Sequence, residues 1–273
     1  MEVDQHKPGH IIYTDKNAVK TTDGTTVVLL AGNSLQGGYK EGRGAEARFY
    51  FITGFTQISD KHVVVSDCFS RCLRLIDRTS GSTSQFSGQC QRKGYADGNP
   101  GLFDFARGIV VDCKNVSQLL LADEYNQAVR SVDVGTGAIN TFARPGLANW
   151  YIRFLTQDKG TGDLYVQAHS AIFKITYLGG KTSILAGSPN GKGFKQGTLL
   201  NSLFNGPHEL IFVGPATLMV ADANSNTVRL LDIHSDKVSL LSIGHTNHPT
   251  ALLLTNNSLY VGQRDKIQRY ACK

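Results

Sequence analysis

Residues 94–130 read GYADGNPGLFDFARGIVVDCKNVSQLLLADEYNQAVR, and the rest of the chain repeats this unit. The unit contains a glycine-rich loop, two apolar runs, the second of which ends in Asp123, and a polar turn that leads to Arg130. Its loop recurs as GYKEG at residues 38–42 and as GFKQG at residues 193–197. An internal repeat of this size indicates a repeat architecture such as a propeller, so the repeat decides the fold.

A phenylalanine follows each glycine-rich loop at a constant distance. It comes seven residues after the second glycine of the loop in all three copies. We interpret these residues as equivalent anchors in the core of successive units: Phe49, Phe105 and Phe204.

Composition and charge narrow the class of protein. The chain has 273 residues, 29 of them glycine and 7 proline, which favours a turn-rich β protein. No apolar run is long enough to span a bilayer. The first ten residues, MEVDQHKPGH, lack the apolar core of a signal peptide, so we expect a removed signal or a piece of a longer chain. The net charge of +6 favours acidic partners and is equally typical of a plain basic surface.

The second apolar run of the unit, which ends in Asp123 in the copy quoted above, recurs six times. The copies lie about 40 to 55 residues apart, which is the size of a propeller blade. These runs lack clean alternation of apolar and polar residues, as do strands that are buried on both faces. The six runs are IIYTD at 11–15, VVVSD at 63–67, LLLAD at 119–123, LYVQ at 164–167, LMVAD at 218–222 and LYVG at 259–262.

An arginine follows three of these runs, seven residues after the final aspartate. In a hairpin this spacing places the two charges on adjacent strands, and the aspartate can also accept backbone N–H groups. We interpret the pairs as repeated supports of the blades and not as catalytic carboxylates. They are Asp67 with Arg74, Asp123 with Arg130, and Asp222 with Arg229.

A further run closes each of the first five units, at residues 25–32, 81–88, 138–144, 181–187 and 237–242. With the glycine loop, the phenylalanine anchor, the ADEYNQAVR segment at 122–130 and the LAG endings at 30–32 and 185–187, the chain resembles the NHL-repeat family. The resemblance implies an all-β, six-bladed β-propeller of four-stranded antiparallel blades, as a single domain over residues 1–273. The expected blades span residues 1–32, 33–88, 89–144, 145–187, 188–242 and 243–273.

Two blades and the chain ends depart from this pattern. The fourth and sixth blades lack the glycine loop, and the fourth carries Gln167 where aspartate is usual. The chain is expected to begin inside the innermost strand of the first blade and to end after the third strand of the sixth. The propeller is therefore expected to be incomplete at its N- and C-terminal seam, which the termini, a missing segment or another chain would close.

The five cysteines contain no CxxC pair, so neither a zinc knuckle nor a thioredoxin-like site is supported. The antiparallel third and fourth strands of the second blade bring Cys72 near Cys90. We expect Cys90 to be oxidised, with Cys72 as its partner and Cys68 as the alternative, whereas Cys113 and Cys272 stay unpaired within the chain.

Two Asn-x-Ser sequons, at Asn115 and Asn256, fall in expected hairpin loops where a glycan is tolerated. Such tripeptides also occur by chance. The alternative interpretation is an intracellular protein in which all five cysteines are reduced. The cysteines and sequons together favour an extracellular or secreted protein.

The loop before the first strand and the loop between the second and third strands share one face of each blade, the face that propellers commonly use for binding. Two arginines and a histidine that converge there predict an anion pocket at the channel mouth, with neutralisation of neighbouring carboxylates as the alternative. The residues aligned at the mouth are Thr53, Arg107, Arg153, His208 and Thr250, with His248, Tyr125, Arg71 and His169 on or near the same face.

We therefore interpret the chain as a non-catalytic recognition propeller for a protein or an acidic glycan, with no cofactor. One alternative is an enzyme similar to the peptide-amidating lyases, in which His169, His208 and His248 would hold zinc, although no ligand spacing supports it. A gluconolactonase-like calcium site is disfavoured because it would need Asn, Asp or Glu side chains around the channel mouth. The residues aligned there are Thr, Arg and His. An RNA-binding NHL propeller is also disfavoured because aromatic residues are not interleaved with the basic ones.

Overall fold

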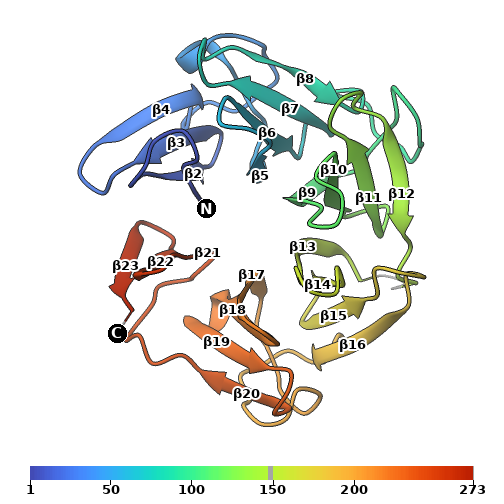
Figure 1. The fold of residues 1–273 in the computed structure, drawn as a ribbon, viewed down its shortest axis with the longest axis vertical. Helices are drawn as coiled ribbons and strands as arrows, with labels where there is room; N and C mark the ends of the chain where they lie inside the picture. Colours follow the sequence, from blue (N-terminus) through green and yellow to red (C-terminus); the bar gives the residue numbers. More distant parts are fainter. Residues whose placement is uncertain (147–149, 273) are drawn as a thin grey trace. The chain divides into compact units, whose positions relative to one another are not determined.

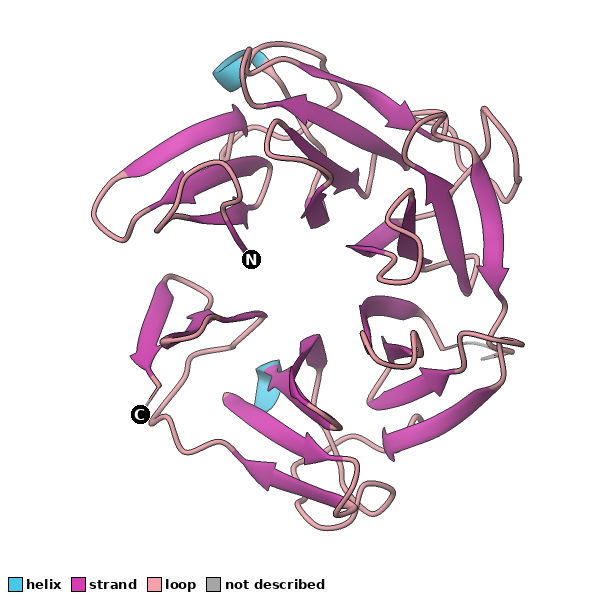
Figure 2. Ribbon diagram, viewed as in Figure 1, coloured by secondary structure: helices cyan, strands magenta, loops and turns pink. Residues whose placement is uncertain are grey.

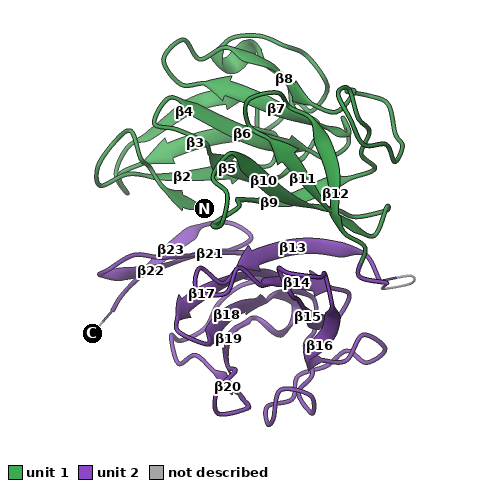
Figure 3. Cartoon of the chain, turned by 45° about the vertical axis from the view of Figure 1, so that its right-hand side comes forward, with its two compact units in different colours: residues 1–144 green, residues 145–273 purple. Residues whose placement is uncertain are grey.

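The computed structural model describes residues 1–146 and 150–272. Strands dominate the described residues, and the two helices among them are three-residue 3-10 turns at Gly44–Glu46 and Ala223–Ser225 (Figures 1 and 2). The strands form six antiparallel sheets, five with four strands and one with three, so the fold is the predicted six-bladed β-propeller. The chain divides into two compact units, residues 1–144 and 145–273, each with three of the sheets (Figure 3).

Unit 1 holds the first three blades. Each sheet follows chain order, so every strand pairs with its neighbours in sequence. The strands are β1 (Glu2–Val3), β2 (Ile11–Asp15), β3 (Ala18–Thr22), β4 (Val27–Gly32), β5 (Ile52–Gln57), β6 (His62–Asp67), β7 (Cys72–Asp77), β8 (Thr83–Ser87), β9 (Ala106–Val111), β10 (Gln118–Asp123), β11 (Ala128–Asp133) and β12 (Ile139–Ala143).

Unit 2 holds the other three blades, and its last sheet has three strands in the described residues, as expected from the sequence. The strands are β13 (Ile152–Gln157), β14 (Leu164–Ala168), β15 (Ala171–Ile175), β16 (Thr182–Gly187), β17 (Pro207–Gly214), β18 (Thr217–Asp222), β19 (Thr227–Asp232), β20 (Lys237–Leu240), β21 (Ala251–Leu254), β22 (Ser258–Gly262) and β23 (Ile267–Ala271).

The six apolar runs of the sequence are the second strands of the six sheets, as predicted. Five consecutive residues of β6, β10 and β18 are buried, because these strands lie between two neighbours in the sheet and are covered on both faces. This explains why the runs are continuously apolar and do not alternate.

The three predicted Asp–Arg pairs are buried ion pairs. Asp67 lies 3.0 Å from Arg74, Asp123 2.8 Å from Arg130, and Asp222 3.3 Å from Arg229, and all six side chains are fully buried. The other carboxylate oxygen of each aspartate accepts a backbone N–H from the segment before the first strand, for example the N–H of Tyr50 at 2.7 Å. Burial raises the pKa of each aspartate, whereas these hydrogen bonds and the arginine lower it.

Each buried arginine also lies between two aromatic rings and donates to loop carbonyls. Arg130 lies 4.5 Å from the ring centroid of Tyr95 and 5.7 Å from that of Phe103, and it donates to the carbonyls of Ala96 and Leu102. Arg74 and Arg229 repeat this arrangement with the pairs Tyr39 and Phe49, and Phe194 and Phe204.

This geometry corrects one predicted anchor. The fully buried equivalent of Phe49 and Phe204 is Phe103, and the assignment of Phe105 is wrong. Gly88 packs on the Phe103 ring as Gly187 packs on the Phe204 ring. The loop of the third blade is two residues shorter between its first glycine and the anchor, so a fixed spacing from the second glycine selects the wrong ring.

Asp4 ties the first blade to the second. Its carboxylate accepts hydrogen bonds from Thr21 at 2.7 Å, from Arg78 at 2.7 Å, and from the backbone N–H groups of His6 and Lys7. Burial opposes ionisation, but the hydrogen bonds outweigh it and lower the pKa of Asp4 to about 2.

We expect the replacement Asp4→Asn to remove a pH-dependent part of the stability. Because the folded pKa lies below the ordinary value of 3.8, the ionised Asp4 stabilises the fold above about pH 4, and this contribution is lost as the pH falls toward 2. Urea unfolding should give a variant less stable than wild type by about 2 kcal/mol at pH 6, with the difference closing near pH 2. An equal difference at both pH values would contradict the assignment.

Cys72 and Cys90 form a disulfide, as predicted, and Cys68 and Cys272 are free thiols. Asn115 and Asn256 are exposed in the hairpin loops after β9 and β21, the locations that the sequence indicated. In the described residues, no helix is long and apolar enough to cross a membrane.

Candidate functional site

In three blades, the chain segment before the first strand lies beside the turn between the second and third strands. In the second blade the N–H of Phe69 donates to the carbonyl of Tyr50 at 3.0 Å, and in the third the N–H of Tyr125 donates to that of Asp104 at 3.1 Å. The fifth blade repeats the bond from Asn224 to Asn205. We call the surface that these paired segments form the turn face of each unit.

Five aromatic side chains gather on the turn face of unit 1. Phe69 lies at their centre, with ring centroids 5.1 Å from Tyr50, 5.7 Å from Phe51 and 5.1 Å from Phe105. Tyr125 continues the group, 4.4 Å from Phe105. The residues come from two neighbouring blades, and we call them the aromatic cluster: Tyr50, Phe51, Phe69, Phe105 and Tyr125.

The aromatic cluster is largely exposed. Tyr50, Phe51, Phe69 and Tyr125 expose 52, 42, 40 and 47% of their surface, whereas Phe105 exposes 8% and forms the floor. Single exposed apolar residues are ordinary, whereas large contiguous apolar patches are typical of interaction sites.

Two members of the cluster have a backbone conformation that bulky residues avoid. Phe51 has φ of 73° and Phe105 has φ of 68°, and the fifth blade has Gly206 at the equivalent position with φ of 73°. A bulky side chain in the left-handed region costs on the order of 1 kcal/mol or more, and such strain collects at functional sites. The fold would accept glycine here, so the phenylalanines serve another purpose.

The fifth blade shows that the framework does not need aromatic residues. It makes the same backbone hydrogen bonds with Asn205, Gly206 and Asn224 in the places of Tyr50, Phe51 and Phe69. The backbone framework therefore does not require aromatic residues at these positions, although the fourth blade also has an aromatic pair, Trp150 and Tyr151, directly before its first strand.

Replacing Phe51 should reveal this strain. We expect Phe51→Gly to be more stable than Phe51→Ala by about 1 kcal/mol, because both lose the exposed ring but only glycine accepts the positive φ without strain. Urea unfolding of the two variants measures the difference. If the alanine variant equals or exceeds the glycine variant in stability, the positive φ at this position carries no strain.

Charged side chains border the cluster, and each has an opposite charge beside it. The Arg71 guanidinium lies 5.1 Å from the centroid of Phe105 and 3.2 Å from the carboxylate of Asp104. Arg107 forms an ion pair with Glu124, which is buried. The rim is thus held in place by ion pairs, and the middle of the surface is apolar.

The disulfide fixes the turn that carries Phe69. Cys72 follows this turn directly, and its partner Cys90 lies beside Gln91, whose N–H donates to the carbonyl of Ser70 at 2.6 Å. A turn that is ordered in the free protein loses less conformational entropy when it binds.

Four of the predicted mouth residues occupy equivalent positions, though not before the strands as expected. Each is the second residue of a first strand and lies at a β-bulge, where the register to the second strand shifts. Thr250 lies directly before β21, where the register is regular. The four bulge residues are Thr53, Arg107, Arg153 and His208.

In unit 1 Thr53 of the second blade lies beside the strand of the third blade that carries Arg107. The Thr53 hydroxyl donates to the carbonyl of Ala106 at 3.2 Å, which places it beside Arg107 on the next blade. Because Glu124 lies against Arg107, the geometry supports the alternative in which this arginine neutralises a neighbouring carboxylate.

In unit 2 the rings of His208 and His248 lie 6.0 Å apart, and Phe154 lies 5.2 Å from His208. Arg153 is exposed on β13 and Thr250 is half-buried. His169 lies in the turn between β14 and β15, and its carbonyl accepts a hydrogen bond from Gln167 at 2.7 Å.

Groups suited to metal binding or nucleophilic catalysis are sparse in this arrangement. Within residues 1–146 and 150–272, no three His, Cys, Asp or Glu side chains are grouped to hold a metal ion. Burial raises the pKa of the Cys68 thiol to about 12, so this cysteine stays protonated at neutral pH and is a poor nucleophile.

Sequence reasoning placed Tyr125 and Arg71 near the turn face but missed Tyr50, Phe51 and Phe69. A signal was present: the paired aromatic residues at 50–51 precede a first strand at the position where the fifth blade has Asn205 and Gly206.

No protein-family model matches the chain, and no curated protein matches it. Many solved structures do. An auxiliary nutrient-binding protein from Bacteroides ovatus has a TM-score of 0.74 at 17% identity, covering 98% of this chain and 68% of that chain. A chain of the nidogen–laminin complex has a TM-score of 0.67 at 14% identity, covering 96% and 89%. Virginiamycin B lyase from Staphylococcus aureus has a TM-score of 0.63 at 14% identity, covering 99% and 79%. At these identities the likeness establishes the β-propeller fold alone.

Proposed function

We propose that the protein is a non-catalytic recognition propeller that binds a protein partner through the aromatic cluster on the turn face of unit 1. The observation that carries the proposal is the exposed cluster itself, in which two phenylalanines hold positive φ values where the fifth blade has glycine. Residues kept at such a cost to stability, and not required by the repeat, serve an external contact.

The composition of the surface favours a protein over a glycan. Phenylalanine, tyrosine and arginine are enriched at the centres of protein interfaces, where apolar rings fill pockets on the partner. Phenylalanine offers no hydrogen-bonding group to sugar hydroxyls, and Arg71 and Arg107 already face carboxylates. The net charge of +6 increases the rate of encounter with an acidic protein.

The comparisons support a binding role, because one solved structure is named for nutrient binding and another for the nidogen–laminin complex. The shared Asp–Arg framework supports kinship with NHL-type blades. In this proposal Thr53 and Arg107 lie at the edge of the binding surface that the aromatic cluster forms. In unit 2, Arg153, His208, His248 and Thr250 remain a predicted anion-binding group.

The proposed location is extracellular. A disulfide persists in oxidising compartments, and the sequon residues Asn115 and Asn256 are exposed in hairpin loops. Expression through a secretory pathway should yield a protein with the Cys72–Cys90 bridge and with glycan at one or both asparagines.

A random peptide library displayed on phage provides a probe, since exposed hot spots select apolar peptides. Hydrogen exchange of the full chain with a selected synthetic peptide should show protection in residues 50–52, 68–71 and 104–107, and no change around Asn115. Selected peptides should combine apolar and acidic residues.

Protection confined to other segments would refute the proposed surface. A glycan array run in parallel tests the competing ligand class. Specific glycan binding, together with failure of the library to yield peptides that protect the turn face, would replace the protein partner by a glycan.

A further inference from the structure

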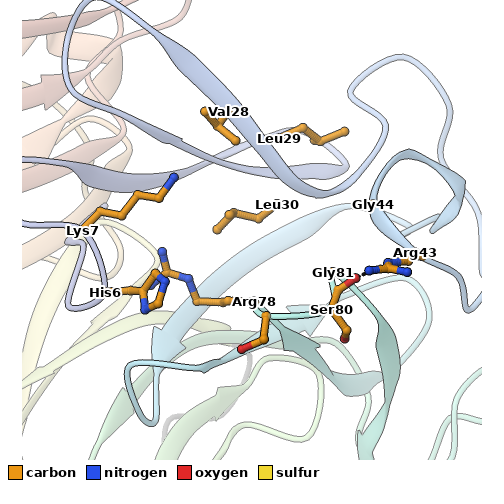
Figure 4. Close-up of a pocket in the computed structure, with 11 residues that line it drawn as sticks. His6, Lys7, Val28, Leu29, Leu30, Arg43, Gly44, Arg78, Ser80 and Gly81 are labelled. Carbon is orange, nitrogen blue, oxygen red and sulfur yellow. Dashed lines mark hydrogen bonds between the residues drawn. The ribbon is translucent and has the colours of Figure 1, made fainter.

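A pocket of about 300 Å³ lies in unit 1, away from the aromatic cluster. Residues of the loop after β1, of the outer strand β4, of the loop before Gly44–Glu46 and of the turn after β7 surround it (Figure 4). We call it the basic pocket. Its lining residues are His6, Lys7, Val28, Leu29, Leu30, Arg43, Gly44, Arg78, Thr79, Ser80 and Gly81.

The ionisable side chains that line the basic pocket are all basic. Lys7, Arg43 and Arg78 come from three separate segments, His6 stands beside them, and no lining residue is acidic. Within the described parts of the chain, the Lys7 ammonium has no hydrogen-bond or ion-pair partner. Arg43 uses its Nε to donate to the carbonyl of Ser80, which leaves its terminal nitrogens for another acceptor.

Arg78 is a buried and ordered part of the pocket lining. Its side chain is 2% exposed, and Figure 4 shows it extending toward His6. One terminal nitrogen donates to Asp4 at 2.7 Å, and the other donates to Gln57 Oε1 and to the carbonyl of Asp60, both at 3.5 Å. Only the buried Nε is without a partner among the described residues. A buried donor without an acceptor is unfavourable. The Nε atoms of Arg74, Arg130 and Arg229 share this feature inside the blades, whereas Arg78 lines the pocket, where an anion offers an acceptor.

Of the nearby carboxylates, Asp4 already pairs with one terminal nitrogen of Arg78, and backbone N–H groups hold both Asp4 and Asp77 in place. Asp4 also accepts hydrogen bonds from the N–H groups of His6 and Lys7, and so positions that loop. Asp77 accepts the N–H groups of Thr79 and Ser80 at 2.8 and 2.9 Å and so shapes the turn. Both acids organise the basic groups from outside the pocket lining.

The other wall of the pocket is apolar. Val28 and Leu29 on the outer strand β4 expose 41 and 38% of their surface, and Figure 4 shows Leu30 between them and Arg78. An apolar wall opposite guanidinium and ammonium groups matches a molecule that carries a carboxylate on a hydrocarbon body.

We propose that the basic pocket binds a small organic carboxylate, with the carboxylate held by Lys7, Arg43 and Arg78 and the hydrocarbon part against Val28, Leu29 and Leu30. This site is separate from the protein-binding surface proposed above and does not rest on it.

Titration of the ¹⁵N-labelled full chain with sodium benzoate at constant ionic strength tests the site. Backbone amides of Lys7, Leu29 and Ser80 should shift and saturate. Benzamide, which has the same shape without the charge, and sodium sulfate, which has charge without the hydrocarbon, should each bind at least fivefold more weakly.

Lys7→Gln and Arg43→Gln should each weaken benzoate binding at least fivefold, whereas Lys93→Gln, an equal change of charge at an exposed residue outside the pocket, should leave it unchanged. Absence of saturable shifts at these amides, or equal affinity of the Lys7 and Lys93 variants, would overturn the site. Benzamide or sulfate binding as tightly as benzoate would overturn the proposed ligand class.

Discussion

Replacing Arg130 by alanine should lower the free energy of unfolding by about 5 kcal/mol, because it breaks a buried ion pair and leaves the Asp123 carboxyl buried without its cation. Arg130 also bonds to Asp97 at 2.6 Å and to two loop carbonyls, and it fills the space between Tyr95 and Phe103. The substitution therefore removes hydrogen bonds, an ion pair and a stacked side chain at one point in the third blade.

The three blades offer a graded comparison. Arg74 and Arg130 each have a second carboxylate, Glu41 and Asp97, whereas the loop beside Arg229 has Gln196 at that position and its ion pair is longer, at 3.3 Å. We expect Arg229→Ala to destabilise less than Arg130→Ala.

Arg144→Ala serves as the control for the arginine series, since Arg144 also stacks on Tyr95 but lies at the surface, where such a contact contributes about 0.5–1 kcal/mol. Urea unfolding of the three variants should rank the losses as Arg130, Arg229, Arg144. If the Arg130 variant is no less stable than the Arg144 variant, the buried pair is not a support of the blade.

These supports were predictable from sequence because they repeat. An aspartate at the end of a buried strand and an arginine seven residues later recur in three blades, and strand geometry allows only a few arrangements for that spacing. The second strands, the Cys72–Cys90 bridge and the three-stranded last sheet followed from the same repeat.

The misassigned anchor of the third blade shows where the repeat pattern gives a wrong prediction. Phe103 and Phe105 are both aromatic and two residues apart, so pattern matching alone does not separate a core ring from one on the turn face. Only the packing of Arg130 against Phe103, and the positive φ of Phe105, distinguishes them.

The candidate surface was harder to predict for a related reason. A binding surface departs from the repeat, and the prediction searched for residues that occupy equivalent positions. It selected Arg107, which the structure pairs with Glu124, and overlooked Tyr50, Phe51 and Phe69, which differ from their counterparts in the fifth blade. Comparison between blades, with attention to what only one or two of them carry, would have found the cluster.

The second large effect is expected at Phe69. Its ring contacts three members of the aromatic cluster and is 40% exposed, so it occupies the centre of the surface without being part of the core. Truncation of a central aromatic hot spot lowers affinity by about a hundredfold, or about 2.8 kcal/mol. The disulfide holds the turn in the variant, so the loss should appear in binding and not in folding.

The central claim is that partner recognition depends on the aromatic cluster. Its most direct test is the dissociation constant of a library-selected peptide for wild type, Phe69→Ala and Leu35→Ala, measured by interferometry at physiological salt. Leu35 is 90% exposed in unit 1 outside the cluster and provides the control for loss of a surface apolar side chain. We predict about hundredfold weaker binding for Phe69→Ala and unchanged binding for Leu35→Ala. Unchanged binding by a folded Phe69→Ala protein would contradict the account.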